Sequence, residues 1–324
     1  MPYKANQKKF DSSKPLVKNS RAKYRVSNWS NYNESLKKRG SLTLWISDDI
    51  KDKWYVSESS SHKRGCQLYY SDFSIMTFLT LRMVFKQPLR QTEGFMKSIF
   101  SLMKIDLEVP NYTRVSRRGD VPKITRKLEK LNEPGHVVVD STGIKVFGES
   151  ELLENKHGKR YKRKVWRTIH IGINEDGLVV AEAMTNHLTD DRDCLPDLLK
   201  QADPMMITEL IADPGYDSQE IYDKLEALNI KPIIPPTRES PSKESNSSRQ
   251  QNINYINNKG IYAWQNKHKY GRRSLVENFM FRFKEIIGRK LRSRKWNNQD
   301  NEAFLGCCIL NKFSKIGMPI SIKI

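Results

Sequence analysis

Apolar residues recur at helical spacing through the first part of the chain. This pattern predicts a helix from Trp29 to Arg39, where Gly40 supplies a stop signal. Residues 71–104 predict two more helices. A short basic helix capped by asparagine is expected at 111–118. Two helices followed by a basic one favour a helix-turn-helix-like arrangement, although an ordinary helical domain with an exposed basic face gives the same pattern.

Apolar β-branched runs then alternate with helical patterns from His136 onward, which predicts an α/β domain with a mixed sheet and helices on its faces. One apolar strand ends at Asp140 and another, Ile207 to Ala212, ends at Asp213. The other expected elements are a hairpin of residues 162–173 and 178–184, helices at 191–201, 218–228 and 271–290, and a strand at 231–235. Pro, Ser and Asn dominate 236–260, which predicts a loop with little structure.

These patterns divide the chain into three parts. The expected parts are a basic N-terminal arm with short helices at 1–60, a mostly helical, helix-turn-helix-like DNA-binding region at 61–134, and a catalytic α/β domain at 135–324 with a loop insertion at about 236–262.

A large basic excess suggests the kind of partner. The 324 residues include 57 Lys and Arg against 37 Asp and Glu, for a net charge of +20. Such a field attracts polyanions, and no apolar run is long enough to cross a membrane, so nucleic acid is the favoured partner. The charge is concentrated at 1–30 and 267–295. The exposed basic helix adds Arg114, Arg117 and Arg118 as candidate DNA contacts.

Three acids are candidates for chemistry. Asp140 and Asp213 each follow a buried strand, and sites in α/β sheets gather at the carboxyl ends of strands. A single Asp at a strand end is usually a cap or turn residue, but two such carboxylates side by side repel unless they share a proton or bind a cation. Oxygen ligands suit Mg²⁺, for which Mn²⁺ can substitute.

Glu277 is the third acid, and it lies on an unusual helical stripe. At 100° per residue, Tyr270, Arg273, Glu277 and Lys284 fall on one side of the predicted 271–290 helix. A solvated face with an Arg273–Glu277 ion pair is the plainer interpretation. Three carboxylates in a strongly basic protein instead point to metal-dependent phosphodiester chemistry, with Arg273 and Lys284 holding the phosphate backbone.

The same residues resemble a known family. Tyr270-x₂-Arg273-x₃-Glu277-x₆-Lys284 is similar to the C-terminal signature of bacterial DDE-type insertion-sequence transposases, in the group called insertion sequence five. Asp140-Ser-Thr-Gly resembles the first-aspartate motif of that family and Asp213-Pro-Gly-Tyr the second, although Pro214 stands where the family more often has a small residue.

The resemblance implies an RNase H-like fold, with the first Asp on the first strand, the second just after the fourth, and the Glu on a late helix. It also implies that Asp140, Asp213 and Glu277 are catalytic and bind Mg²⁺, and that Tyr270, Arg273 and Lys284 grip DNA near the cut. The implied activity is cut-and-paste transposition, with double-stranded DNA (terminal inverted repeats and target) as partner, a homodimer in the DNA complex, and a cytoplasmic, nucleoid-associated location in a bacterium.

Two other functions fit the same residues. One is an RNase H-like structure-specific nuclease that does not transfer strands. The other is an inactive DNA-binding relic that acts as a repressor, which the complete set of Asp140, Asp213 and Glu277 disfavours.

Overall fold

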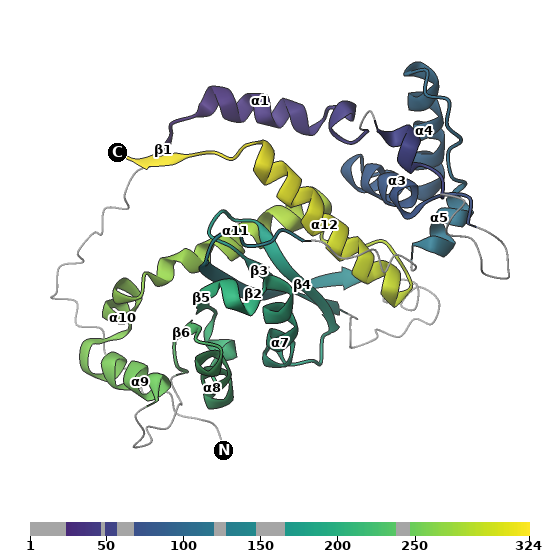
Figure 1. Ribbon diagram of the computed structural model, residues 1–324. Helices are drawn as coiled ribbons and strands as arrows, with labels where there is room; N and C mark the ends of the chain where they lie inside the picture. Colours follow the sequence, from purple (N-terminus) through teal and green to yellow (C-terminus); the bar gives the residue numbers. More distant parts are fainter. Residues whose placement is uncertain (1–23, 47–48, 57–67, 120–127, 147–165, 238–246) are drawn as a thin grey trace, which may run out of the picture.

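The computed structural model describes residues 24–46, 49–56, 68–119, 128–146, 166–237 and 247–324 (Figure 1). Residues 1–23 of the predicted basic arm therefore lie outside the described residues. From there, β1 (Tyr24–Val26) pairs antiparallel with β8 (Ser321–Lys323), so the two ends of the described chain form a small sheet of their own.

A mixed sheet forms the centre of the molecule. Its strand order is β4-β3-β2-β5-β6, and β7 pairs with the far end of β2. The strands β2, β3 and β4 are antiparallel neighbours, whereas β5 and β7 run parallel to β2, and β6 runs parallel to β5. Their bounds are β2 Gly135–Val146, β3 Trp166–Ile173, β4 Val179–Asn186, β5 Ile207–Ile211, β6 Lys231–Ile233 and β7 Lys290–Leu291. Three antiparallel strands followed by two parallel ones form the RNase H-like arrangement, as expected.

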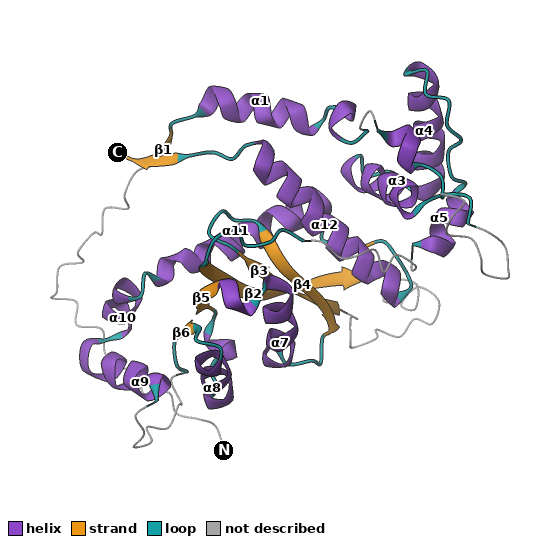
Figure 2. Ribbon diagram, viewed as in Figure 1, coloured by secondary structure: helices purple, strands orange, loops and turns teal. Residues whose placement is uncertain are grey.

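Helices lie against the central sheet (Figure 2), and alternating residues of β2 belong to two separate buried clusters. Val137 and Val139 pack in one buried cluster with α7 (Asp191–Ala202) and α8 (Gln219–Ala227). Val138 packs in the other with α11 (Ser274–Arg282) and α12 (Trp296–Ile316). Side chains at even positions of β2, including residue 140, therefore face α11.

The N-terminal helices share this second core. Their bounds are α1 Trp29–Arg39, α2 Ile50–Lys53, α3 Asp72–Val84, α4 Leu89–Leu102 and α5 Tyr112–Arg118. Phe78 of α3, Phe100 of α4 and Val115 of α5 belong to the same buried cluster as Leu305 of α12. The helical region is thus packed on the catalytic domain. Nine residues separate α4 from α5, more than a helix-turn-helix turn normally has.

Local signals predicted most of these elements. Gly40 follows α1, Asn111 caps α5 by accepting a hydrogen bond from the Thr113 amide, and Ser218 caps α8. The hairpin turns at Asn174–Gly177, where Gly177 adopts a φ of +72°. Within the described residues, no helix is long and apolar enough to cross a membrane.

Three predicted features were wrong. The strand through Asp140 does not end there, because β2 continues for six residues along β3 and β7. The segment predicted as a loop at 236–260 contains α9 (Ser248–Lys259), and α10 (Ile261–Lys267) directly follows it. The predicted 271–290 helix is a 3₁₀ turn (Tyr270–Arg273), α11 and a π-helical turn (Phe283–Ile287), and the longer α12 follows it.

Candidate active site

The sheet register brings Asp140 and Asp213 to the same level. Val138 of β2 is paired with Ile211 of β5, and each aspartate lies two residues beyond its member of that pair. The chain stays extended at Asp213, with φ −80° and ψ 172°. Because neighbouring strands lie about 4.8 Å apart, the two carboxylates emerge side by side where β5 ends.

A tight turn fixes the second aspartate. The Asp213 Oδ1 atom accepts a hydrogen bond of 2.9 Å from the Gly215 amide and so caps the turn Pro214–Tyr216. A Cβ at position 215 would lie 3.0 Å from the same oxygen, so glycine fits best there. Pro214 is at the first position of the turn, where no amide hydrogen is needed, and it leaves the carboxylate in place.

Arg273 joins the first aspartate to the third acid. Its Nη1 donates to Asp140 Oδ2 at 3.1 Å, and its Nη2 donates to the Glu277 carboxylate one helical turn later. The predicted Arg273–Glu277 pair therefore forms, but it faces the sheet and includes Asp140. One guanidinium thus binds two of the three candidate acids.

The electrostatics of Asp140 reflect this gathering of acids. Burial raises the pKa of the Asp140 carboxyl, and the negative charges of Asp213 and Glu277 raise it further, against the lowering effects of the Ser141 amide and Arg273. Over the described ranges, no three side chains of His, Cys, Asp or Glu are grouped closely enough to hold a metal ion. In this conformation the cation beside Asp140 is Arg273.

Tyr270 is buried behind the second aspartate. Its side chain is 9% exposed, and its hydroxyl donates to the Ala212 carbonyl at 3.1 Å, one residue before Asp213. Burial raises the pKa of Tyr270 to about 12, so the hydroxyl keeps its proton. Tyr270 and Arg273 also line a cleft of about 760 Å³ between the Asp213 turn and the α9–α10 helices.

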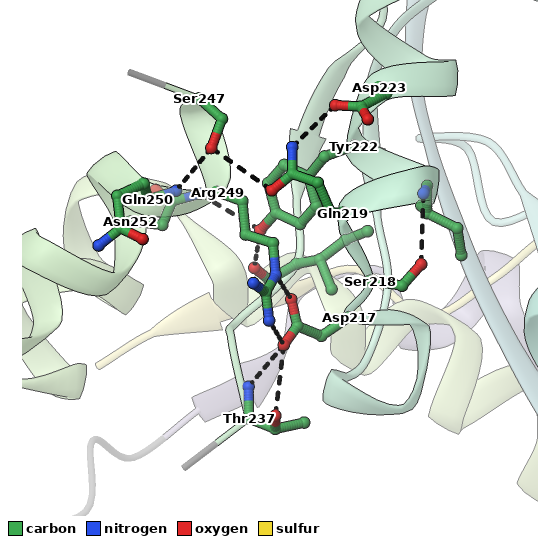
Figure 3. Close-up of polar contacts among 12 residues, drawn as sticks. Asp217, Ser218, Gln219, Tyr222, Asp223, Thr237, Ser247, Arg249, Gln250 and Asn252 are labelled. Carbon is green, nitrogen blue, oxygen red and sulfur yellow. Dashed lines mark hydrogen bonds and ion pairs between the residues drawn. The ribbon is translucent and has the colours of Figure 1, made fainter. Parts of the chain in front are cut away.

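Asp217, which directly follows the Asp213 turn, is bound to Arg249 of α9 and to Thr237, as Figure 3 shows. Its buried carboxylate accepts hydrogen bonds from Arg249 Nε and Nη2 at 2.7 and 2.9 Å. It also accepts from the amide and hydroxyl of Thr237 at 2.9 and 3.3 Å. The sequence did not indicate this anchor, because Arg249 lay in the predicted loop. A signal was available in Asp217 itself, which is an acidic residue directly after the Asp-Pro-Gly-Tyr motif.

The predicted DNA contacts differ in exposure. Arg114 and Arg117 are exposed on α5, and Lys284 is half-buried in the π-helical turn, seven residues after Glu277. Arg118 is only 13% exposed, because it donates to Asp72 at 2.7 Å and to the Tyr70 carbonyl. Arg118 therefore holds α5 against α3 in this structure.

An RNase H-like sheet with acids at its carboxyl-end edge defines a class of nucleic-acid enzymes. A family model described as "Transposase DDE domain" matches residues 131–312, and a second model with the same description matches residues 37–149. The chain belongs to the transposase DDE domain family, and it is a DDE transposase. Of the three functions that fit the sequence, the family match supports this one.

Solved structures with a similar course of the chain include two transposase complexes. The piggyBac transposase synaptic complex with hairpin DNA has 10% sequence identity and a TM-score of 0.35, over 88% of this chain and 77% of that one. A pre-cleavage Mos1 transpososome has 11% identity and a TM-score of 0.22, over 80% and 83%. The family assignment rests on the family models alone.

Proposed function

We propose that this transposase binds the terminal inverted repeats of its own element and moves it by cut-and-paste transposition, with Asp140, Asp213 and Glu277 as its catalytic acids. The observation that carries the proposal is the register of β2 and β5, which sets Asp140 beside Asp213. The bridge from Arg273 then adds Glu277 to the same site.

The donor chemistry of these acids fits a divalent cation. The pKa of Asp140 is raised by burial first and then by the charges of Asp213 and Glu277, and the three carboxylates offer oxygen ligands of the kind that Mg²⁺ or Mn²⁺ prefers. Mg²⁺, when bound there, activates the attacking oxygen and stabilises the leaving oxygen. Asp140, Asp213 and Glu277 would hold it, and Arg273 would exchange its carboxylates for a DNA phosphate.

The other signature residues have distinct proposed roles. Tyr270 keeps the strand before Asp213 in position through the Ala212 carbonyl, so its role is positioning instead of the direct grip on DNA that the resemblance implies. Lys284 lies about 10 Å along the helix from Glu277 and binds phosphate there.

We also propose membership of the bacterial insertion-sequence-five group, supported by the spacing of the Tyr-Arg-Glu-Lys signature. Joining two element ends calls for two copies of the enzyme, so a homodimer is proposed in the DNA complex. The thiols of Cys194, Cys307 and Cys308 are free, which is compatible with action in the cytoplasm on nucleoid DNA.

The test of this function uses DNA that flanks the reading frame. Incubation of the wild-type protein with that duplex and Mg²⁺ is expected to give cuts at the ends of short inverted repeats, followed by joining to a target duplex. Cleavage at unrelated junctions without joining would contradict transposition and indicate a structure-specific nuclease.

Replacing Lys284 by Ala is expected to weaken DNA binding and to reduce the slope of log affinity against log salt by about one unit, because one phosphate contact is lost. The measurement is a salt titration of binding to the flanking duplex. Lys224→Ala is the matched control, since Lys224 is exposed on α8 and paired with Glu220. An unchanged slope for Lys284→Ala would place this side chain away from phosphate.

A further inference from the structure

The loop between β7 and α12 carries three exposed cations in four residues, Arg292, Arg294 and Lys295. Its backbone is bound on the inner side. The amides of Arg292 and Ser293 each donate to the Glu302 carboxylate at 2.9 Å. The carbonyls of Ser293 and Arg294 each accept from Gln299 Nε2 at 3.1 Å.

Both residues that bind this backbone are buried: Gln299 is 0% exposed and Glu302 is 8% exposed. The Glu302 carboxylate therefore accepts hydrogen bonds from two backbone amides of the loop. Gln299 Oε1 also accepts from Arg167 Nε, and the Arg167 guanidinium lies 4.7 Å above the ring of Trp296. The loop is a fixed structure that presents positive charge to solvent.

The basic helix α5 is fastened beside this loop, at the start of α12 (Figure 1). Asn301 Nδ2 donates to the Gly119 carbonyl at 2.8 Å, and Asn298 Nδ2 donates to the Ser116 carbonyl at 3.4 Å. These bonds place the exposed side chains of α5 in a constant position relative to the loop.

A cavity of about 350 Å³ lies between α5 and the loop, lined by Ser116, Arg292, Arg294 and Asn298 among others. Arg82 forms part of its wall, and the buried Arg82 Nε atom has no hydrogen-bond partner among the described residues. An unsatisfied buried donor is costly, and an anionic oxygen in the cavity would satisfy it.

The sheet gives the distance from this surface to the acids. Six strand steps separate Asp140 from Val146, which is roughly 20 Å at about 3.3 Å per step. Val146 is paired with Leu291, the residue just before Arg292. For a duplex whose axis runs along β2, base pairs stacked at about 3.4 Å make this separation about six base pairs.

We propose that Arg292 and Arg294, together with Arg114 and Arg117 of α5, bind the phosphate backbone of duplex DNA about six base pairs from the bond that is cut. This inference rests on the proposed function, which places the cut at Asp140. The surface joins the helical region to the catalytic domain, so both hold one DNA segment. Of the three arginines of α5 that were predicted to contact DNA, the proposal includes Arg114 and Arg117. It leaves out Arg118, because Arg118 forms an ion pair with Asp72 of α3.

The test is the double variant Arg292→Ala/Arg294→Ala with the duplex that flanks the reading frame, in Ca²⁺ instead of Mg²⁺. The slope of log affinity against log salt is expected to fall by about two, and phosphate protection is expected to disappear about six base pairs from the cut. Arg292→Lys/Arg294→Lys should keep the slope. Lys200→Ala/Lys224→Ala, which removes two exposed cations of α7 and α8, should also leave it unchanged.

An unchanged slope and unchanged protection in the Ala double variant would overturn the proposal. So would loss of self-association with DNA binding intact, which would make the surface a protein interface. The salt slope does not depend on cleavage, so a failure of the proposed chemistry at Asp140 would leave that readout unaffected and would not be mistaken for a failure of this surface.

Discussion

Replacing Asp140 or Asp213 by Asn is expected to lower Mg²⁺-dependent cleavage of the flanking duplex by more than about 10³-fold while leaving DNA binding intact. Each substitution removes one of the two negative charges that the β2–β5 register places side by side. The fold should be kept, because an Asn Oδ1 can still accept the hydrogen bond that the Ser141 amide donates to Asp140, or the one that the Gly215 amide donates to Asp213. Single-turnover cleavage and gel-shift binding, measured together, check this result.

Glu277→Gln is expected to behave in the same way, and the chain offers a close control for it. Glu285 forms an i,i+4 pair with Arg289, as Glu277 does with Arg273, and both glutamates are exposed, but only the arginine of the Glu277 pair also binds Asp140. Glu285→Gln should therefore cut at the wild-type rate. Wild-type cleavage by Glu277→Gln would show that Glu277 is not the third acid.

Replacing Asp217 by Ala is expected to lower the free energy of unfolding by about 3–5 kcal/mol, because Arg249 would be left largely buried without its carboxylate. Cleavage should also fall, since the Asp213 turn would lose its anchor to α9. Urea unfolding at neutral pH measures the first effect.

Asp223→Ala is the control for that variant. Asp223 accepts a hydrogen bond from Gln219 on the surface of α8, and its loss should cost less than about 0.5 kcal/mol. Asp217→Leu combined with Arg249→Met should be more stable than Asp217→Ala, because the double variant does not bury a guanidinium that has lost its carboxylate. A change below about 1 kcal/mol for Asp217→Ala would contradict the role given to this network.

Local patterns in the sequence predicted the elements that depend on short-range chemistry. Asn111 and Ser218 are caps whose side chains bind amides two or three residues ahead, so their helices could be located from the sequence. The sequence predicted Asp140 and Asp213 side by side only if their two strands paired; the β2–β5 register provides that pairing, although β2 continues past Asp140.

The remaining features depend on contacts between distant residues. Four of the twelve residues of α9 are Asn, which has low helix propensity, yet Asn252 accepts a hydrogen bond from buried Trp264 at 2.8 Å. The start of α12 has no side-chain cap, so no local signal marks it. Tyr270 lies in a 3₁₀ turn, where 100° spacing does not apply, so its predicted alignment with Glu277 concealed its burial.

A metal site built from Asp140, Asp213 and Glu277 is tested most directly by replacing Mg²⁺ with Fe²⁺ in the DNA-bound enzyme. Ascorbate and peroxide then generate radicals at the bound Fe²⁺, and the positions at which they cut the polypeptide are mapped. Carboxylate oxygens that hold Mg²⁺ should also bind Fe²⁺, and the radicals formed there cut the nearby backbone. We expect polypeptide cuts close to residues 140, 213 and 277 in the wild-type enzyme, which excess Mg²⁺ suppresses and Asp140→Asn loses. Cuts elsewhere, or cuts that persist in Asp140→Asn, would contradict a metal site built from these three acids.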